Sequence, residues 1–485
     1  MNFNLVEMYN GLLRFNKHIL NELAEGLKHL PNLDGVSKGD SLIINEQGNP
    51  AWGSSAFIPT FENAAYGIEW TKNDNDIIRI GNAKFHRELP IQNRLKGCVY
   101  NEKKISYFLN PTGWAKPLEN GLIPPLDGSD GDVGVRVPEF YMCVKDTGTK
   151  YQLWISDFNI DGTFTRIHPF IISHTKTMTR TREDGKEEVF SACIKHDDTR
   201  YLGGNKNSSV VATKLQGRPR TEINYDKANE FCANRGDWIT MIDYLEYCAL
   251  QALCYIEYAN FDNQAALNTN LTSEGFKQGG LGAGVTNLEW NRWLRFNGSN
   301  PIVQTYWSAE HNIGNGNTNG DRYELSAYND DGSNFSTYPV FYHGIHLFGD
   351  IWSFVRDVVI INKDTDYNSV YLLKKGVAHA DVTVDNVDEK CYFIGYQANT
   401  NNYITEFDLQ RGPYFIPNLV GTNKKFDYNY TRDNNGQDTD KSVRVLLVGG
   451  RACSSSAAGS GYFSSYRVRS DSRANVGFFT TVKLD

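Results

Sequence analysis

Histidines are the most direct candidates for chemistry in this chain. They include His168, His174, His196, His311, His343 and His346. A histidine can catalyse hydrolysis when a nucleophile and an orienting carboxylate lie beside it. The chain contains no Gly-x-Ser-x-Gly elbow and no His-Glu-x-x-His motif, the signatures of two such sites. We therefore expect packing and hydrogen-bonding roles for His343 and His346, and no enzyme activity.

Two clusters of acidic residues offer oxygen ligands to a hard cation such as Ca²⁺. They lie at residues 127–132 and 433–440. Neither has the spacing of a twelve-residue calcium loop, and acidic turns of this kind are usually solvated. The Gly-rich stretch at 279–284 lacks the Lys-Ser/Thr pair of a phosphate-binding loop. We therefore expect neither a metal ion nor a cofactor.

The cysteines show no metal-ligand spacing. The eight positions are Cys98, Cys143, Cys193, Cys232, Cys248, Cys254, Cys391 and Cys453. Cys248 and Cys254 fall on a predicted helix, where we expect them to pack and not to form a bridge. The pattern predicts free thiols in a protein made in a reducing cytoplasm.

The elements that must position these residues begin with an attachment region. A 3-4 apolar spacing, typical of a helix that buries one face, is formed by Leu5, Met8, Leu12, Phe15 and Ile19. The helix either packs on its own domain or forms a short coiled coil that oligomerises the chain or anchors it to a particle. We assign residues 1–36 to this helical segment and residues 37–56 to a β-hairpin linker with its turn at 47–49.

From residue 57 the sequence predicts short strands separated by Gly, Asn and Pro. We divide this part into a β-rich region at 57–130, which leads into the tip, and a domain at 131–485. Helical periodicity returns at 225–234, with Asn224 as the N-cap and Gly236 just past the end, and again at 239–258. Two helices among many strands predict an α+β fold.

The C-terminal segment has a restricted alphabet. Between Ser442 and Val482 there is no Lys, Glu, Gln, Met or Trp. Every residue type present there can be encoded by a codon that ends in a pyrimidine, as expected if adenines in Asn-type codons had been randomised. Tyr, Ser, Gly and Asn are typical of adaptable recognition loops, so the segment predicts a binding surface. The net charge of −8 disfavours a nucleic-acid partner.

Ordered sequence blocks resemble one protein family. Val448-Gly449-Gly450, Ser465-Tyr466-Arg467 and residues 471–478 resemble the C-terminal end of the formylglycine-generating-enzyme type of C-type lectin fold. Upstream blocks follow the family's order at 132–141, 153–156, 167–170, 217–219, 244–247, 278–282 and 344–352. Diversity-generating retroelements use this subfamily for variable proteins, many of them tail-fibre tips of phages such as those of Bacteroides.

The resemblance implies a C-type-lectin-like receptor-binding domain with inserted loops and a variable segment at about 443–482. The protein would then be a virion tail-fibre or tail-tip adhesin, made in the bacterial host cytoplasm. Its partners would be a host surface receptor, either glycan or protein, and other tail proteins through the N-terminus. We expect a homo-oligomer, without nucleic acid and without membrane insertion.

Two alternatives stay open. One is a structural virion component that does not contact the receptor. The other is an enzyme, either capsule-degrading or of the formylglycine-generating type. The family's oxidases bind metal through a pair of cysteines in the C-terminal segment, whereas here Cys453 stands alone. The Glu-Pro-Asn, Gln-Pro-Asp and Trp-Asn-Asp tripeptides of calcium-dependent animal lectins are absent as well.

Strand alternation predicts the residues that contact the receptor. Over residues 461–467, alternation places Tyr462, Ser464 and Tyr466 on one face, and Phe463 and Ser465 on the other. In the family, the residue that matches Ser465 is buried and its neighbours are exposed, while Arg473 matches a framework position. We therefore expect receptor contacts from Arg451, Tyr462, Ser464, Tyr466, Arg467 and Arg469.

Overall fold

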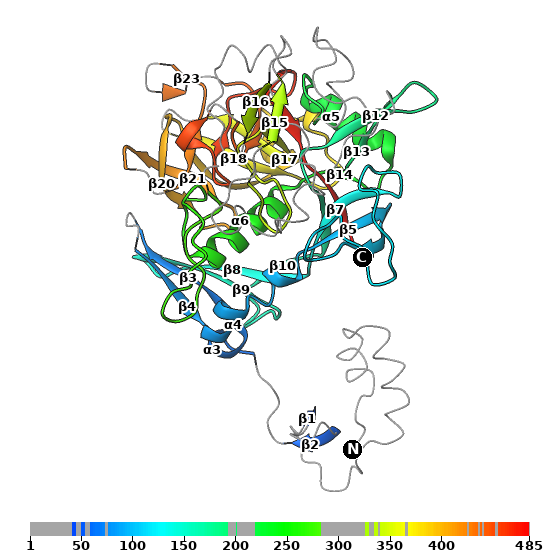
Figure 1. Ribbon diagram of the computed structural model, residues 1–485. Coiled ribbons are helices and arrows are strands. Elements are labelled where there is room, and N and C mark those ends of the chain that lie inside the picture. The colour runs from blue at the N-terminus through cyan, green and yellow to red at the C-terminus, as the bar shows by residue number, and fades with distance from the viewer. Residues whose placement is uncertain are drawn as a thin grey trace, which may run out of the picture. The chain divides into compact units, whose positions relative to one another are not determined.

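The computed structural model divides the chain into two compact units, Met1–Pro59 and Thr60–Asp485 (Figure 1). It describes residues 41–44, 50–53, 59–72, 76–192, 200, 219–282, 325–328, 334–337, 340–363, 367–423, 426–434, 437–438, 441–451 and 454–484. Among these residues, no helix is long and apolar enough to cross a membrane.

The N-terminal unit contains a β-hairpin. Strand β1 (Ser41–Ile44) pairs antiparallel with β2 (Pro50–Gly53), and Ile44 lies opposite Pro50. The hairpin agrees with the strand, turn and strand that the sequence predicts, with residues 45–49 as the connection. The helix predicted for residues 1–36 lies outside the described residues.

The larger unit begins with two antiparallel sheets. A five-stranded sheet has the order β10-β8-β9-β3-β4. Its strands are β3 (Ala65–Thr71), β4 (Ile77–Gly81), β8 (Phe140–Asp146), β9 (Lys150–Ser156) and β10 (Thr165–Ile167). A six-stranded sheet has the order β14-β28-β11-β7-β5-β6. Its strands are β5 (Lys96–Asn101), β6 (Lys104–Phe108), β7 (Asp132–Val137), β11 (Phe170–Ser173), β14 (Thr240–Met241) and β28 (Thr480–Lys483).

Both sheets combine strands from distant parts of the chain. Strand β3 pairs with β9 along its whole length, from Ala65 opposite Ser156 to Thr71 opposite Lys150. The C-terminal strand β28 pairs with β11 and with β14. The predicted regions 57–130 and 131–485 therefore share both sheets and form one folded body.

A nine-stranded sheet forms the other half of this unit. Its order is β19-β18-β17-β25-β26-β22-β20-β21, and β27 pairs parallel with β17 on the edge opposite β25. The strands are β17 (Trp352–Asn362), β18 (Tyr367–Leu373), β19 (Cys391–Ala398), β20 (Asn402–Asp408), β21 (Ile416–Gly421), β22 (Tyr428–Tyr430), β25 (Arg444–Val448), β26 (Phe463–Ser464) and β27 (Val476–Phe478). Separate two-stranded pairs are β12 (Met178–Thr181) with β13 (Glu187–Phe190), β15 (Leu325–Tyr328) with β16 (Asn334–Thr337), and β23 (Asp433–Asn434) with β24 (Gln437–Asp438).

The two long helices lie where the periodicity predicts them. Helix α5 spans Tyr225–Arg235, and the Asn224 side chain accepts a hydrogen bond from the Lys227 amide at its start. Helix α6 spans Tyr244–Tyr258 and begins later than predicted, because Asp243 and Glu246 form a capping box. Short helical turns complete the unit: α3 (Phe61–Ala64), α4 (Ala83–Glu88), α8 (Val387–Lys390), η2 (Gln92–Arg94), η5 (His379–Asp381) and η6 (Ser455–Ala457).

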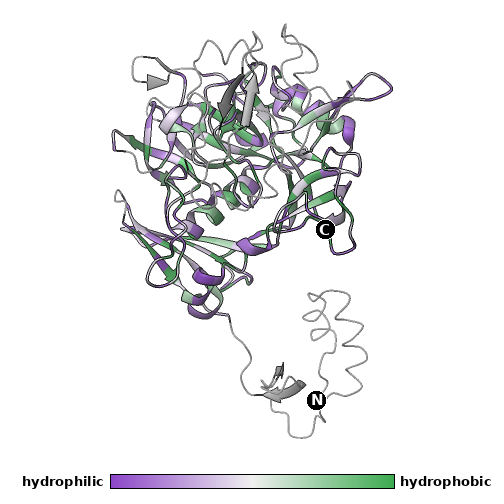
Figure 2. Cartoon of the chain, in the orientation of Figure 1, coloured by the Kyte–Doolittle hydropathy of each residue, from purple (hydrophilic) through white to green (hydrophobic). Residues whose placement is uncertain are grey.

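Helix α6 lies at the centre of the core. It contacts β3 and β9 of the five-stranded sheet and β17 of the nine-stranded sheet. Figure 2 shows hydrophobic residues gathered around it. The other face of the nine-stranded sheet packs on α5, where the rings of Tyr225 and Phe354 meet edge to face at 5.7 Å. Layers of sheet around a buried helix confirm the α+β class.

Candidate functional site

The nine-stranded sheet includes three strands of the predicted variable segment. Strands β25, β26 and β27 come from this segment, and the strand that pairs with β26 on its other side, β22, comes from outside it. Figure 1 shows that these C-terminal strands lie among strands from earlier parts of the chain. Cys453 lies outside the described residues.

Tyr462 and Ser464 are buried, so the expectation that strand alternation exposes them is wrong. Tyr462 is 7% exposed and Ser464 is 1% exposed. The Tyr462 ring packs against Trp352 at 4.4 Å and against Tyr428 at 5.7 Å. Ser464 lies in β26 between Leu447 of β25 and Tyr430 of β22. Alternation separates the two faces of a strand, but here neighbouring elements cover both faces.

Ser465 is buried, as the family resemblance implies, with 0% of its surface exposed. Its carbonyl accepts a hydrogen bond from the fully buried Arg444 guanidinium at 3.3 Å. Arg444 also donates to the Asn368 side chain of β18 at 3.0 Å. This buried arginine fixes the backbone just before the residues that reach the surface.

Tyr466 and Arg467 do reach the surface, where Tyr466 contacts Tyr430 of β22 and Arg432, two residues farther along the chain. The rings of Tyr430 and Tyr466 are stacked, with centroids 5.1 Å apart and planes 17° apart. The guanidinium carbons of Arg467 and Arg432 lie 4.8 Å and 5.5 Å from the centre of the Tyr466 ring. Such contacts combine aromatic stacking with cation–π attraction.

Arg451 belongs to the same cluster. Burial and Tyr466 raise the pKa of Tyr430, and the positive charges of Arg451 and Arg467 oppose that shift. Arg451 therefore lies within electrostatic reach of the stacked tyrosines. We refer to the surface formed by Tyr428, Tyr430, Arg432, Arg451, Tyr466 and Arg467 as the tyrosine–arginine face. All six side chains are partly exposed.

The contribution of β22 was not foreseen from the sequence. Tyr428, Tyr430 and Arg432 alternate with Asn429 and Thr431, which are buried. The buried pair is held by the β19–β20 connection: Asn429 donates to the Ala398 carbonyl at 2.9 Å, and Thr431 donates to the Asn399 carbonyl at 3.2 Å. The signal that could have revealed this strand is Tyr-x-Tyr-x-Arg, a period-2 pattern with aromatic and cationic residues on one side.

Arg469 contacts the first residues of α5. Its guanidinium pairs with Asp226 at 2.5 Å, and its carbonyl accepts a hydrogen bond from the Tyr225 amide at 3.0 Å. The structure thus brings together three of the predicted residues, Arg451, Tyr466 and Arg467. It connects Arg469 to the start of a helix and buries Tyr462 and Ser464.

The loop that carries η6 borders the tyrosine–arginine face. The Tyr403 hydroxyl lies 3.0 Å from Ser456 Oγ, and the Tyr403 and Tyr428 rings meet edge to face at 5.2 Å. The Gln264 side chain donates a hydrogen bond to the Ala458 carbonyl at 2.6 Å and thereby anchors the loop. Ser455 and Ser456 are exposed, so the loop extends the polar margin of the face.

Substitution of Tyr466 or Arg467 need not disturb the local backbone, because other residues bind its carbonyls. Three successive carbonyls are held: Ser465 by Arg444, Tyr466 by Arg432 Nε at 2.6 Å, and Arg467 by the Val445 amide at 3.0 Å. Farther along, the Glu222 and Trp352 amides bind the Arg473 and Asn475 carbonyls, each at 3.0 Å.

Three of the candidate catalytic histidines, His174, His343 and His346, have contacts that belong to the fold, whereas His168 is exposed. His174 and His346 are fully buried, and burial lowers the pKa of His174 to about 3 and of His346 to about 4. His346 lies beside the buried ion pair between Lys176 and Asp350, which are 2.5 Å apart. His343 Nε2 lies 2.8 Å from the buried Glu257 carboxylate. His196 and His311 lie outside the described residues.

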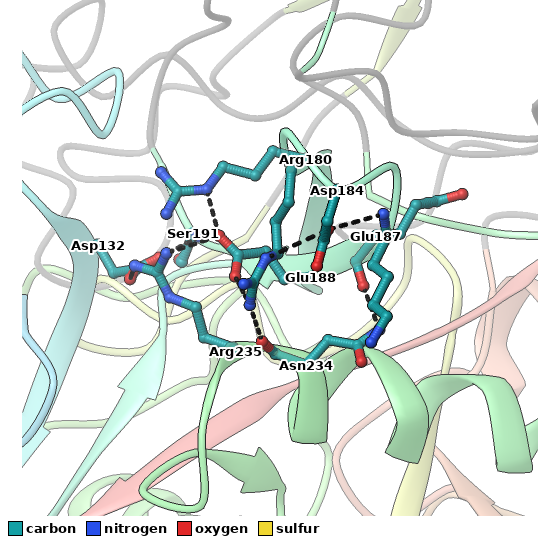
Figure 3. A network of polar contacts seen from close by, with 10 residues as sticks. Asp132, Arg180, Asp184, Glu187, Glu188, Ser191, Asn234 and Arg235 are labelled. Carbon is teal, nitrogen blue, oxygen red and sulfur yellow. Dashed lines mark hydrogen bonds and ion pairs between the residues drawn. The ribbon is translucent and has the colours of Figure 1, made fainter.

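Residues of the acidic cluster at 127–132 also form ion pairs and hydrogen bonds within the fold. Asp132 of β7 pairs with Arg235 of α5 at 2.6 Å, and Arg235 reaches Glu188 of β13 at 3.0 Å (Figure 3). Asp130 accepts a hydrogen bond from the Tyr107 hydroxyl at 3.0 Å. Within the part of the chain that the structure describes, no group of three or more His, Cys, Asp or Glu residues could hold a metal ion. The side chains of 433–440 are not among those described.

A cavity of about 950 Å³ lies apart from the predicted residues. Trp114, His343 and several asparagines are among the residues that line it. None of the predicted receptor contacts lines it; its lining residues are Asn93, Leu95, Lys96, Gly97, Phe108, Leu109, Asn110, Pro111, Gly113, Trp114, Leu118, Glu119, Asn120, His343 and Gly344. The predicted contacts therefore define a surface face, and this cavity is a separate feature.

Neither protein-family models nor curated proteins match this chain.

Proposed function

We propose that this chain is the receptor-binding tip of a phage tail fibre, built on a C-type-lectin-like fold. The proposal is supported by the ordered sequence blocks between residues 132 and 478 and by the restricted alphabet of the C-terminal segment. The α+β architecture is compatible with it. The tyrosine–arginine face is the single observation that carries the proposal.

The composition of this face suits binding. Tyr and Arg are enriched among the residues that dominate binding energy, since each combines a large contact area with directional hydrogen bonds. Tyr428 and Tyr430 offer two aromatic rings from one strand, and Tyr466 adds a third from the variable segment. Arg432 and Arg467 flank the Tyr466 ring with cationic groups.

The mechanism is display of variable side chains on a fixed backbone. The carbonyls of Ser465, Tyr466 and Arg467 are bound by Arg444, Arg432 and the Val445 amide, which are not replaced when Tyr466 or Arg467 is substituted. A substitution at Tyr466 or Arg467 changes the surface while these backbone hydrogen bonds persist. A chain of this design can alter its receptor preference without losing its fold.

Residues 1–36 would attach the tip to other tail proteins or to copies of the same chain. The supporting observation is the apolar stripe from Leu5 to Ile19, since burying each such side chain stabilises an assembly by roughly 1.5 to 3 kcal/mol. The protein would act without catalysis, metal or cofactor, and it would reside in the virion tail.

The test compares two double variants in phage particles. Tyr466→Ala/Arg467→Ala removes both variable-segment members of the stack and should reduce adsorption to the host at least tenfold. Tyr392→Ala/Tyr396→Ala is the matched control, because both tyrosines are exposed on β19, and it should adsorb as the parent does. Thermal unfolding of the purified variants verifies folding.

Unchanged adsorption of the Tyr466→Ala/Arg467→Ala particle would refute the proposed function and favour a structural virion component. Time-dependent shortening of capsular polysaccharide, or copper-dependent oxidation of a sulfatase-type cysteine peptide, would instead indicate an enzyme. The gene's neighbourhood gives a separate test, because retroelement diversification requires a reverse transcriptase and a near-copy of the 3′ end that differs at adenines.

A further inference from the structure

The tyrosine–arginine face differs in charge from the rest of the protein. The chain carries a net charge of −8, yet Arg432, Arg451 and Arg467 belong to this face, and Arg473 is close enough to Arg467 to influence its ionisation. Asp471 lies within 4 Å of both Arg432 and Arg467. A cationic patch on an acidic protein attracts anionic ligands selectively.

The contact between Arg467 and Asp471 is long. Arg467 Nη1 lies 3.5 Å from Asp471 Oδ2, whereas strong charge-assisted hydrogen bonds measure about 2.7 to 2.9 Å. Arg473 is exposed, and its positive charge lowers the pKa of Arg467 in addition to the effect of burial. Like charges brought together at a surface are stabilised when an anion binds between them.

The stacked tyrosines add a second kind of recognition. Tyr430 and Tyr466 present nearly parallel rings beside the arginines, with 17° between their planes. Aromatic side chains pack against the C–H faces of sugar rings, and their hydroxyl groups bond to polar substituents. Guanidinium groups bind carboxylate, sulfate and phosphate through two parallel N–H donors. Sugar rings that carry acidic groups satisfy both kinds of contact.

We propose that the ligand of the tyrosine–arginine face is an acidic polysaccharide, whose anionic groups bind Arg467 and Arg473 while a sugar ring packs on Tyr466. This inference rests on the proposed function, since it names the chemistry of the receptor. It goes further by selecting an anionic glycan over a neutral glycan and over a protein.

The experiment measures binding of the full chain to immobilised polymers by biolayer interferometry. Polygalacturonate and chondroitin sulfate present carboxylate and sulfate, and wall teichoic acid presents phosphate. Fully methyl-esterified polygalacturonate is the neutral match, and poly-glutamate is the acidic polymer without sugar. We expect at least one acidic glycan to bind at least tenfold more tightly than both the ester and poly-glutamate, with affinity that falls as salt rises.

The variants connect that preference to this face. Arg467→Gln/Arg473→Gln should weaken binding to the preferred glycan at least tenfold, and Tyr466→Ala should weaken it as well. Arg87→Gln/Arg411→Gln removes the same charge from two exposed arginines elsewhere and should bind as the parent does. An equal loss in both double variants would indicate nonspecific attraction and would overturn the inference.

The remaining outcomes separate the inference from the proposed function. If no acidic glycan binds more tightly than the neutral ester, or poly-glutamate binds as tightly, the inference is wrong even where adsorption still requires Tyr466 and Arg467. If the face binds an acidic glycan but adsorption does not depend on it, the inference stands and the receptor-binding role fails.

Discussion

Tyr430 of β22 stacks on Tyr466 of the predicted variable segment, with ring centroids 5.1 Å apart. The contact joins a residue outside the predicted variable segment to one inside it. Half of the tyrosine–arginine face, Tyr428, Tyr430 and Arg432, therefore belongs to the framework. Any side chain that replaces Tyr466 meets the same Tyr430 ring and the same Arg432 guanidinium.

The stack should contribute a measurable coupling energy. A double-mutant cycle of Tyr430→Ala and Tyr466→Ala should give about 0.5 to 1.5 kcal/mol, the usual value for an aromatic pair beyond its buried area. Urea unfolding of the parent, both single variants and the double variant measures it. Strictly additive losses would show that the rings are neighbours without energetic coupling.

Tyr462 should behave as a core residue, although it lies in the variable segment. Tyr462→Ala removes a ring packed on Trp352 and Tyr428 and should cost about 3 to 5 kcal/mol of unfolding free energy. Tyr392→Ala, at a tyrosine that is 61% exposed, should change stability by about 0.5 kcal/mol or less. A Tyr462→Ala variant as stable as the parent would contradict the burial.

Glu257 should make stability depend on acid. Burial opposes ionisation of Glu257, but His343 and Lys277 outweigh it and hold its pKa at about 2, below the ordinary value of 4.5. A lowered folded-state pKa contributes stability above about pH 4.5 that is lost as the pH falls towards 2, on the order of 3 kcal/mol in all.

The matched variants are Glu257→Gln and Glu88→Gln, because Glu88 is an exposed glutamate of α4. Unfolding by urea between pH 7 and pH 2.5 should show a smaller loss of stability in Glu257→Gln than in the parent. Glu88→Gln should follow the parent curve. Parallel curves for the parent and Glu257→Gln would show that the Glu257 carboxylate is not stabilised in the folded state.

Removal of residues 1–36 should separate assembly from folding. Residues 60–485 form a compact unit with its own core, so the truncated chain should stay folded and soluble. It should lose self-association in light scattering and incorporation into virions. The same oligomer in both proteins, together with normal incorporation, would contradict an attachment role for the apolar stripe.

Local signals in the sequence were sufficient for several elements. Asn224 and Gly236 delimit α5 because a cap and a helix terminator act on their own neighbours. The β1–β2 hairpin follows from strand residues on either side of a short polar turn. Cys248 and Cys254 lie buried on α6 as free thiols, as their helical spacing and apolar neighbours predict.

The site depended on contacts between distant segments. Tyr462 and Phe463 pack in different hydrophobic clusters, as alternation predicts for neighbouring residues, but alternation could not tell which face a neighbour covers. Trp352 and Tyr428 bury Tyr462, and β22 together with Arg432, which follows it, supplies the rings and the guanidinium that complete the surface. The sequence by itself therefore determined the α+β class and the boundaries of α5, and it indicated the segment proposed for binding. Only the tertiary structure decided which side chains reach solvent, because burial of a strand face depends on elements that pair and pack with it from far along the chain.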